Sequence, residues 1–318
     1  MKADIYNRYS DYLKERYGER VYKLPIHIPV SCPNRRNGQF GCTYCGEEGA
    51  GFEQSSGAFS VAGQLLDNMD YIGRRYKAKK FISYFQSFTN TFLPPNEFRQ
   101  FMLEAVQNNI VEIAVSTRPD CIRSEYLDIL KEIKETHQIE ITVELGLQTA
   151  NYHSLQKVNR GHTLGEYIES ALLVKSYGFQ LCTHLILNLP WDTSIDVVES
   201  AKIVSVLHSD YVKLHGLYIE KGTEMARQYE AQEFEICSVA EYRERVILFL
   251  EHLSPNIVMQ RLLGRAPEEN TLFSNWGQSW WKIRDEIEEE MRKRNTYQGK
   301  KFHYLGGSGV QCFFEEER

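Results

Sequence analysis

Three cysteines crowd into one short segment of a chain that holds seven in total. Cys32, Cys42 and Cys45 follow the spacing C-x9-C-x2-C, and the glycines and asparagines among them allow the backbone to wrap around a bound group. Three thiolates occupy only part of a metal's coordination sphere. A [4Fe–4S] cluster held in this way keeps one iron open for an exchangeable ligand.

Zinc is the other metal that short cysteine spacings attract. A structural zinc site has four protein ligands, so a histidine would have to supply the fourth. His27 precedes the cysteine segment, and no other histidine lies within it. Spacing alone therefore leaves two hypotheses: an iron–sulfur site, or a zinc-stabilised binding module without catalysis.

Strands and helices alternate through most of the chain and must position this segment. Helical patterns separate the strand-like runs; one of them begins at a capping box formed by Thr163 and Glu166. Six strand–helix units are too few for a closed eight-unit barrel, so the pattern predicts a partial (β/α)6 TIM-like barrel of the α/β class. The predicted strands cover residues 24–30, 81–85, 111–116, 139–145, 181–187 and 211–217.

The remainder of the chain is mostly helical in pattern. We predict a barrel domain over residues 1–237 and a helical C-terminal extension over 238–318 that packs on the barrel. Functional residues are expected at the C-terminal ends of the strands, as in other α/β barrels. The cysteine segment follows the first predicted strand directly, which agrees with that expectation.

Composition limits the classes of partner. The net charge is −6, so binding RNA would require a local basic patch, for which residues 74–80 and 292–301 are the candidates. No apolar run approaches the roughly 20 residues that a membrane span needs. The odd cysteine count argues against a secreted disulfide scaffold. We therefore expect a cytoplasmic protein without membrane contact.

The cysteine segment resembles the cluster loop of radical S-adenosylmethionine (SAM) enzymes in the branch of the elongator catalytic subunit, where the first gap is wider than usual. Nearly the whole chain resembles the YtqA/YhcC-like members of that branch. The resemblance implies one [4Fe–4S] cluster on the three cysteines and reductive cleavage of SAM to a 5′-deoxyadenosyl radical. The matching motifs are Cys32-Pro33-Asn34-Arg35, Tyr84-Phe85-Gln86, Thr89-Asn90-Thr91, Ser116-Thr117-Arg118-Pro119-Asp120-Cys121, Val143-Glu144-Leu145-Gly146-Leu147-Gln148-Thr149, Asn159-Arg160-Gly161-His162 and Val212-Lys213-Leu214-His215.

The same resemblance suggests where SAM binds. Tyr44, just before the last cysteine, is expected against the adenine. Polar residues after the second and third strands are expected near the amino group and carboxylate of SAM. These candidates are Gln86, Thr89, Asn90, Ser116 and Arg118. The guanidinium of Arg118 has two possible partners, the carboxylate of SAM or the side chain of Asp120.

The fourth strand ends with two further candidates, Glu144 and Gln148. A carboxylate there can accept both ribose hydroxyls, and a buried carboxylate without a partner would be costly. Arg160 is either the ion-pair partner of Glu144 or a second clamp on the SAM carboxylate. His184, Lys213 and His215 lie on later strands, and no general base is assigned among them.

One motif departs from the family. The usual Gly-Leu-Pro-Gly after the fifth strand is Asn188-Leu189-Pro190-Trp191 here, which puts the shape of the adenine or substrate pocket in question. The resemblance implies a wobble-uridine C5 side chain of tRNA as substrate, in a carboxymethylaminomethyl-to-aminomethyl type of step. An electron donor such as flavodoxin or ferredoxin is the other expected partner. A small-molecule substrate is the alternative.

Overall fold

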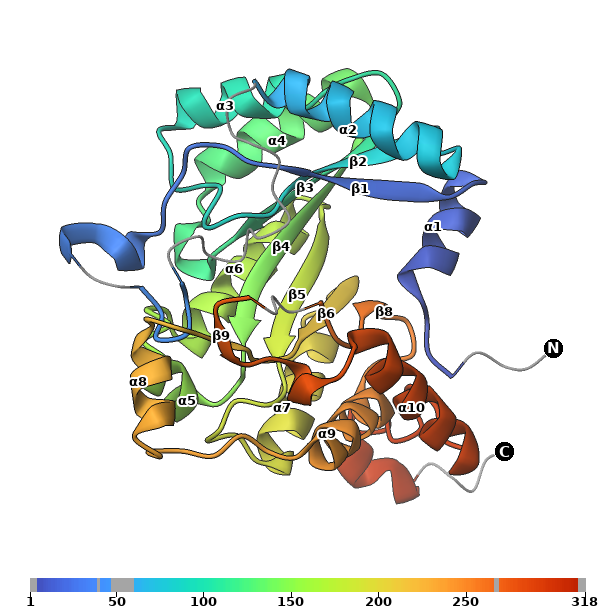
Figure 1. Ribbon diagram of the computed structural model, residues 1–318. Helices are drawn as coiled ribbons and strands as arrows, with labels where there is room; N and C mark the ends of the chain where they lie inside the picture. The colour runs from blue at the N-terminus through green and yellow to red at the C-terminus, as the bar shows by residue number, and fades with distance from the viewer. Residues whose placement is uncertain (1–4, 39–40, 47–59, 266–268, 314–318) are drawn as a thin grey trace.

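A single parallel sheet organises the molecule (Figure 1). The computed structural model describes residues 5–38, 41–46, 60–265 and 269–313, so Gln39 and Phe40 of the cysteine segment lie outside the described residues. Seven strands pair in the order β1-β2-β3-β4-β5-β6-β8 and curl into a half-barrel, which confirms the predicted partial barrel. The strands are β1 (Val21–Ile26), β2 (Lys80–Phe85), β3 (Ile110–Thr117), β4 (Glu140–Gln148), β5 (Gln180–Ile186), β6 (Tyr211–His215) and β8 (Val258–Arg261).

Two differences from the predicted strands stand out. The first strand lies three residues earlier than expected, because the apolar run continues into Ile28, which is buried without joining the sheet. The seventh strand, β8, was not predicted at all. Strand β8 lies after residue 238 and pairs with β6 in the same sheet. The domain boundary between residues 237 and 238 stays a prediction.

Helices cover the outer face of the sheet, where alternate strand residues such as Ile141, Val143 and Leu145 are buried. The capping box of Thr163 and Glu166 is confirmed at the start of α6. None of the helices in the described part of the chain is long and apolar enough to cross a membrane. The outer helices are α2 (Val61–Tyr76), α3 (Pro95–Glu104), α4 (Ser124–His137), α5 (Tyr152–Lys157), α6 (Leu164–Ser176) and α7 (Ser194–Val206).

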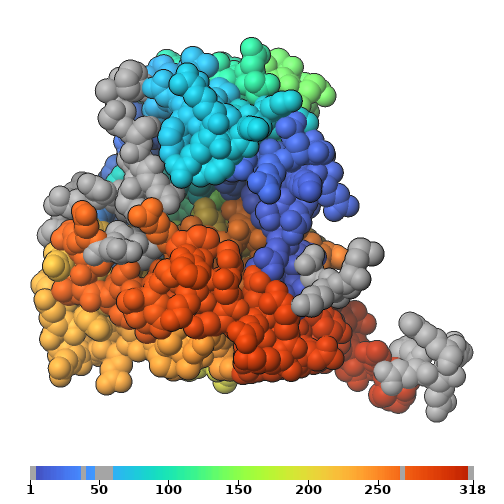
Figure 2. Space-filling view, turned by 45° about the vertical axis from the view of Figure 1, so that its right-hand side comes forward, coloured from blue at the N-terminus to red at the C-terminus, as the bar shows by residue number. Residues whose placement is uncertain are grey.

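The C-terminal region packs against the N-terminal segment of the chain. Figure 2 shows the orange-to-red C-terminal segment packed beside the blue N-terminal one. The Tyr6 hydroxyl donates to Glu288 Oε1 over 2.8 Å, and Arg8 forms an ion pair with the same carboxylate. The elements here are β7 (Ile219–Glu220) paired with β9 (Thr271–Phe273), α8 (Glu224–Glu230), α9 (Val239–His252) and α10 (Trp280–Lys293).

The first helix, α1 (Tyr9–Tyr17), closes one end of the half-barrel. Its Leu13 is buried against inward-facing residues of β2 and β3, and its Tyr12 hydroxyl bonds with Tyr211 of β6. In Figure 1, α1 and the cysteine segment lie at opposite ends of β1. Among the described residues, α1 thus covers the end of the half-barrel that lies opposite the cysteine segment.

Candidate functional site

The cysteine segment is tied to the turn between α5 and α6. A short 3-10 helix (Pro33–Gly38) follows β1, and the Asn34 amide donates to the carbonyls of Asn159 at 2.7 Å and Arg160 at 3.0 Å. In return, Asn159 donates to the carbonyl of Gly41 over 2.8 Å. These reciprocal bonds explain the Asn159–His162 motif: it is the platform on which the cysteine segment rests.

Gly161 offers a steric test of the contact between the cysteine segment and the Asn159–His162 turn. Its φ is +73°, and a Cβ added there would lie 2.1 Å from the Asn34 side-chain oxygen. We expect Gly161→Ala to displace Asn34 and lower the free energy of unfolding by about 1–3 kcal/mol, measured by urea denaturation. Gly178→Ala is the matched control, because Gly178 has a similar φ of +69° and an added Cβ would meet nothing within 4 Å. It should cost only the strain of the backbone, about 1 kcal/mol, and equal losses in both variants would contradict a steric role of Gly161 beside Asn34.

The cysteine sulfurs lie beside two buried guanidinium groups. Arg118 Nη1 is 3.8 Å from Cys32 Sγ, and Arg160 Nη1 is 3.6 Å from Cys42 Sγ. A hydrogen bond with Cys45 lowers the pKa of Cys42 well below its ordinary value, and the charge of Arg160 adds to that effect against the opposing effect of burial. Thiolate ligands with cationic donors at their sulfurs suit a negatively charged iron–sulfur cluster, so the residues fit that group.

Arg118 and Arg160 each have further contacts, which bear on the partners predicted for them from the sequence. Arg118 forms a fork with Asp120, at 2.9 Å and 2.8 Å, which is the second of its two predicted partners. Arg160 Nη2 donates to the carbonyl of Gly146 over 2.8 Å. Arg160 does not contact Glu144, so the hypothesis of an ion pair between them is wrong. Its predicted contact with the SAM carboxylate stays a prediction.

The ends of β2 and β3 are joined by Asn90. Its amide donates to the carbonyls of Phe85 at 3.0 Å and Ser116 at 2.8 Å, while its Oδ1 is buried with no partner. Thr89 is buried beside it, and Gln86 is partly exposed. The structure thus brings these candidates to one edge of the sheet, where the predicted contacts with SAM stay predictions. The same holds for Gln148, which is half-buried just after Gly146 with a φ of +76°.

Tyr44 packs against an apolar cluster near the same edge, together with Leu189 and Trp191, and its hydroxyl is hydrogen-bonded with Cys42. Within this cluster Trp191 contacts Phe234 at a ring distance of 5.5 Å. Asn188 accepts a hydrogen bond from the Leu217 amide over 2.7 Å. The departure from the usual glycines therefore replaces backbone flexibility with packing behind Tyr44.

The barrel interior holds a buried polar network centred on Glu144. The side chain of Glu144 is fully buried. Its Oε1 contacts Lys23, and its Oε2 lies 2.8 Å from His184 and 3.4 Å from Lys213. Lys213 also donates to the Tyr84 hydroxyl over 2.5 Å. Both carboxylate oxygens already have partners, and a contact of Glu144 with ribose stays a prediction.

Protonation in this network follows from burial and from the neighbouring charges. Burial acts to raise the pKa of Glu144, but Lys213, Lys23 and His184 outweigh it and hold that pKa well below its ordinary value. Burial, with the nearby Glu144 acting in the opposite sense, lowers the pKa of Lys213 to about 8. Burial and the charge of Lys213 lower the pKa of His184 to about 4. At neutral pH Glu144 is therefore a carboxylate, Lys213 is mostly an ammonium group and His184 is a neutral imidazole.

Sequence reasoning missed several of these residues. Lys23 and Gln260 were not identified, although both reach Glu144. Alternation along β1 places Lys23 on the inward face, and that was the available signal. Cys182 lies with Glu144 and His184 so that their ligand atoms are within 4.8 Å of one another. The two lysines on Glu144 already neutralise it, so this trio is poorly suited to a cation.

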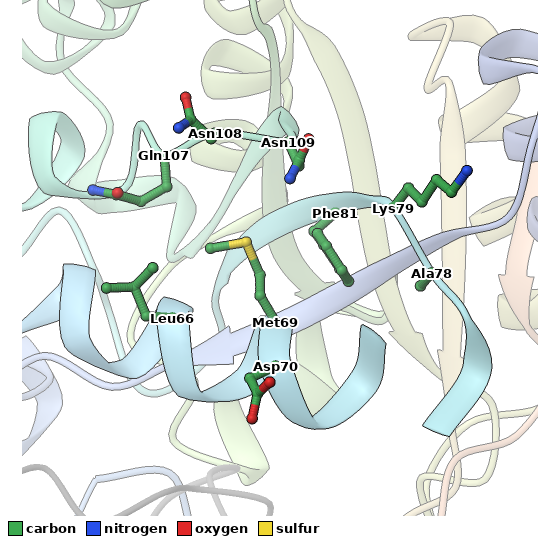
Figure 3. Close-up of a pocket in the computed structure, with 9 residues that line it drawn as sticks. All are labelled: Leu66, Met69, Asp70, Ala78, Lys79, Phe81, Gln107, Asn108 and Asn109. Atoms are coloured by element: carbon green, nitrogen blue, oxygen red, sulfur yellow. The ribbon is translucent and has the colours of Figure 1, made fainter. Parts of the chain in front are cut away.

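A pocket of about 550 Å³ opens elsewhere, between α2 and the turns that lead into β2 and β3. Figure 3 shows Leu66 and Met69 on α2 facing the turn of Gln107, Asn108 and Asn109. These turns are at the N-terminal edge of the sheet, the end opposite the cysteines. The pocket is therefore separate from the site described above.

Comparison with known proteins agrees with this geometry. The chain is 32% identical over 303 residues to YtqA of Bacillus subtilis, covering 94% of each protein. It is 26% identical over 141 residues to the tRNA uridine(34) acetyltransferase of Methanocaldococcus jannaschii, which is 43% of this chain and 25% of that protein. A solved structure of Elp3 from Methanocaldococcus infernus has the same fold, with a TM-score of 0.66 at 16% identity over 76% of this chain and 60% of that one.

Two family profiles match the chain in succession. The radical SAM superfamily matches residues 30–204, and the radical SAM C-terminal domain matches residues 209–293. The first match begins just before the cysteine segment and ends within α7, so it includes the sulfur environment and most of the inward-facing network. A match of this length, together with similarity along almost all of YtqA, shows that the chain belongs to the radical SAM superfamily.

Proposed function

We propose that this radical SAM enzyme acts on the C5 side chain of the tRNA wobble uridine, in a carboxymethylaminomethyl-to-aminomethyl type of step. The family implies a [4Fe–4S] cluster and SAM as cofactors. Together these cofactors would supply reductive cleavage of SAM and abstraction of a hydrogen atom from substrate. The overall step would break the bond between the nitrogen and the carboxymethyl carbon: SAM and water would be consumed, and glyoxylate, methionine and 5′-deoxyadenosine would be released beside the aminomethyl product. An electron donor such as flavodoxin or ferredoxin completes the proposal.

The chain's own residues have distinct parts in this proposal. Cys32, Cys42 and Cys45 hold the cluster, and Arg118 and Arg160 direct positive charge at the sulfurs. At the far end of the half-barrel, Leu13 of α1 packs on inward-facing residues of β2 and β3, which suits chemistry that must be kept from solvent. The proposed SAM contacts are Tyr44, Gln86, Thr89, Asn90, Ser116, Arg118, Glu144, Gln148 and Arg160.

The observation that carries the substrate part is the similarity to a tRNA uridine(34) acetyltransferase. The two basic stretches add little support to the proposed tRNA substrate. Arg292, Arg294 and Lys301 of the second stretch form ion pairs with glutamates. The first stretch, residues 74–80, lies at the N-terminal edge of the sheet, away from the cysteines. Phosphate contacts would therefore have to come from other residues around the mouth of the half-barrel.

A small-molecule substrate is the second candidate. The ion-paired state of the second basic stretch and the net charge of −6 favour it. Binding of tRNA separates the two candidates, because binding through phosphates weakens steeply as salt rises. A small-molecule enzyme would show no such salt-dependent binding.

The test uses tRNA from a strain in which the gene is deleted. We expect the anaerobically reconstituted enzyme, with SAM and a reductant, to deplete carboxymethylaminomethyluridine and produce aminomethyluridine in nucleoside mass spectrometry. Cys42→Ser is the matched control and should leave the profile unchanged. If the unaltered enzyme also leaves every nucleoside unchanged while it cleaves SAM, the tRNA proposal is wrong.

A further inference from the structure

One layer of the barrel interior carries more positive than negative charge. We define the inner layer as Lys23, Tyr84, Glu144, His184 and Lys213, side chains from five neighbouring or facing strands that contact one another. The layer holds two ammonium groups and a single carboxylate. Glu112 of β3 accepts a hydrogen bond from Thr142 over 2.7 Å and, among the described residues, forms no ion pair with either lysine. Burial raises the pKa of Glu112, and the charge of Lys23 opposes that rise. Within the inner layer, two cations therefore share one carboxylate.

Of the two cations, Lys213 lies farther from the carboxylate that they share. Lys23 contacts Glu144 Oε1 closely and also donates to Gln260 at 3.0 Å, whereas Lys213 is 3.4 Å from Glu144 Oε2 and shares that oxygen with His184. Its one short hydrogen bond goes to the neutral hydroxyl of Tyr84. A buried ammonium is costly unless a carboxylate pairs with it, so Lys213 would gain from a second anion.

The inner layer is accessible and lies close to the cysteines. The side chains of Lys23, His184 and Lys213 keep 18%, 13% and 9% of their surface exposed although they point into the half-barrel. Glu144 precedes Gly146 by two residues on β4, or roughly 7 Å along the strand. The Gly146 carbonyl is held by Arg160, which in turn contacts Cys42. A ligand above the inner layer would thus lie directly between Lys213 and the cysteine segment.

We infer that the inner layer binds a carboxylate of the substrate, with Lys213 as the main contact and Lys23 as the second cation. The inference rests on the proposed function and names its substrate class: an acid-bearing uridine side chain. It also favours binding of the substrate over retention of the product. The carboxymethylaminomethyl group ends in a carboxylate, which Lys213 attracts, while the aminomethyl product ends in an ammonium, which Lys213 repels.

The first measurement compares binding of matched RNAs. The holoenzyme, with SAM present, is titrated with an anticodon stem-loop that carries either carboxymethylaminomethyluridine or its methyl ester. We expect the acid to bind at least about tenfold more tightly than the ester, the difference that one charge-assisted hydrogen bond supplies. Lys213→Met should reduce the acid-to-ester ratio to within about twofold, and Lys213→Arg should retain most of it.

Two controls separate recognition from general damage. The ratio is taken within each variant, so a loss of folded protein does not change it, and bound iron per chain reports on the cofactor site. Lys131→Met removes an exposed lysine of α4 and should leave the ratio unchanged. A preference for the acid that survives in Lys213→Met would overturn the inference.

The second measurement does not depend on RNA. Reductive methylation at pH 8 is followed by peptide mass spectrometry, with Lys131 as the internal reference. N-acetylglycine, an acid, should protect Lys213 in the SAM-bound holoenzyme, whereas the neutral N-acetylglycinamide should not. If SAM alone gives the whole protection and the acid adds none, the anion at Lys213 belongs to SAM and the inference is wrong.

The two proposals can fail separately. Equal binding of acid and ester RNA, with the RNA still converted, overturns the carboxylate inference and leaves the proposed function standing. Protection of Lys213 by N-acetylglycine without any conversion of RNA supports the carboxylate site and removes the tRNA substrate.

Discussion

Cys42→Ser should abolish the cluster and with it the cleavage of SAM. Cys42 is buried and contacts both Arg160 and the amide of Asn34, so a hydroxyl there would replace a thiolate ligand at the best-enclosed position of the three. We expect 5′-deoxyadenosine formation to fall by at least about 1,000-fold, because the three cysteines act together and the loss of one removes the function of all three. The measurements are bound iron, the visible absorbance of the reconstituted protein, and 5′-deoxyadenosine by mass spectrometry.

Cys312→Ser is the matched control, because Cys312 is exposed in the last described helical turn (Ser308–Phe313). It should retain full iron and full cleavage of SAM. Cys32→Ser and Cys45→Ser should behave as Cys42→Ser does, since a cluster with two cysteine ligands is not retained. One tightly bound zinc and no iron in the anaerobically purified parent protein would instead support the zinc-stabilised module.

The central strands could be predicted because each is an apolar run between turn residues. Strands β2 to β6 lie between helices and a packed interior, so their outward faces read as Val, Ile and Leu. Strand β8 gives no such signal. It has four residues, and two of them are polar: Gln260 contacts Glu144 in the barrel interior, and Arg261 contacts His215 at the end of β6. A four-residue strand with two polar residues has too few apolar positions for its alternation to be recognised in the sequence.

The candidate site could be predicted in part for a related reason. The cysteines and Arg118 lie in local motifs, so their spacing and order are visible in the chain. The partners of Glu144 are not local: Lys23 is 121 residues away, and Gln260 is 116 residues away on the far side. Which cation meets Glu144 depends on the curl of the sheet, which brings β1 and β8 towards β4. Arg160 has two candidate partners in the sequence analysis, Glu144 and the SAM carboxylate, and the fold places its guanidinium at Gly146 and Cys42.

Glu144→Gln should be among the most destabilising single substitutions in the barrel. The change keeps the shape of the side chain and removes its charge, which leaves Lys23 and Lys213 facing each other without a carboxylate between them. Breaking a buried ion pair by removing one partner costs about 3–5 kcal/mol, and we expect a loss of that order in urea denaturation. Glu132→Gln, which loses an exposed pair with Arg99, should cost no more than about 1 kcal/mol.

The pH dependence gives this prediction a second readout. The pKa of Glu144 is lowered in the folded state, so its contribution is complete above the unfolded value near 4.5 and is lost as pH falls towards the folded value. The parent protein should therefore lose stability relative to Glu144→Gln as the solution is acidified below about pH 4.5. A difference between the two proteins that stays constant down to pH 3 would contradict an ionised Glu144.

A double substitution shows whether the lysines are the cause. In Glu144→Gln with Lys213→Met, one of the two stranded ammonium groups is gone, so the combined loss should be smaller than the sum of the two single losses. For groups in direct contact, such a coupling amounts to about 0.5–3 kcal/mol. Additive losses would mean that Lys213 is compensated by something other than Glu144. In that case Lys213 would not be available to a substrate carboxylate, so this cycle also tests the charge balance on which carboxylate recognition depends.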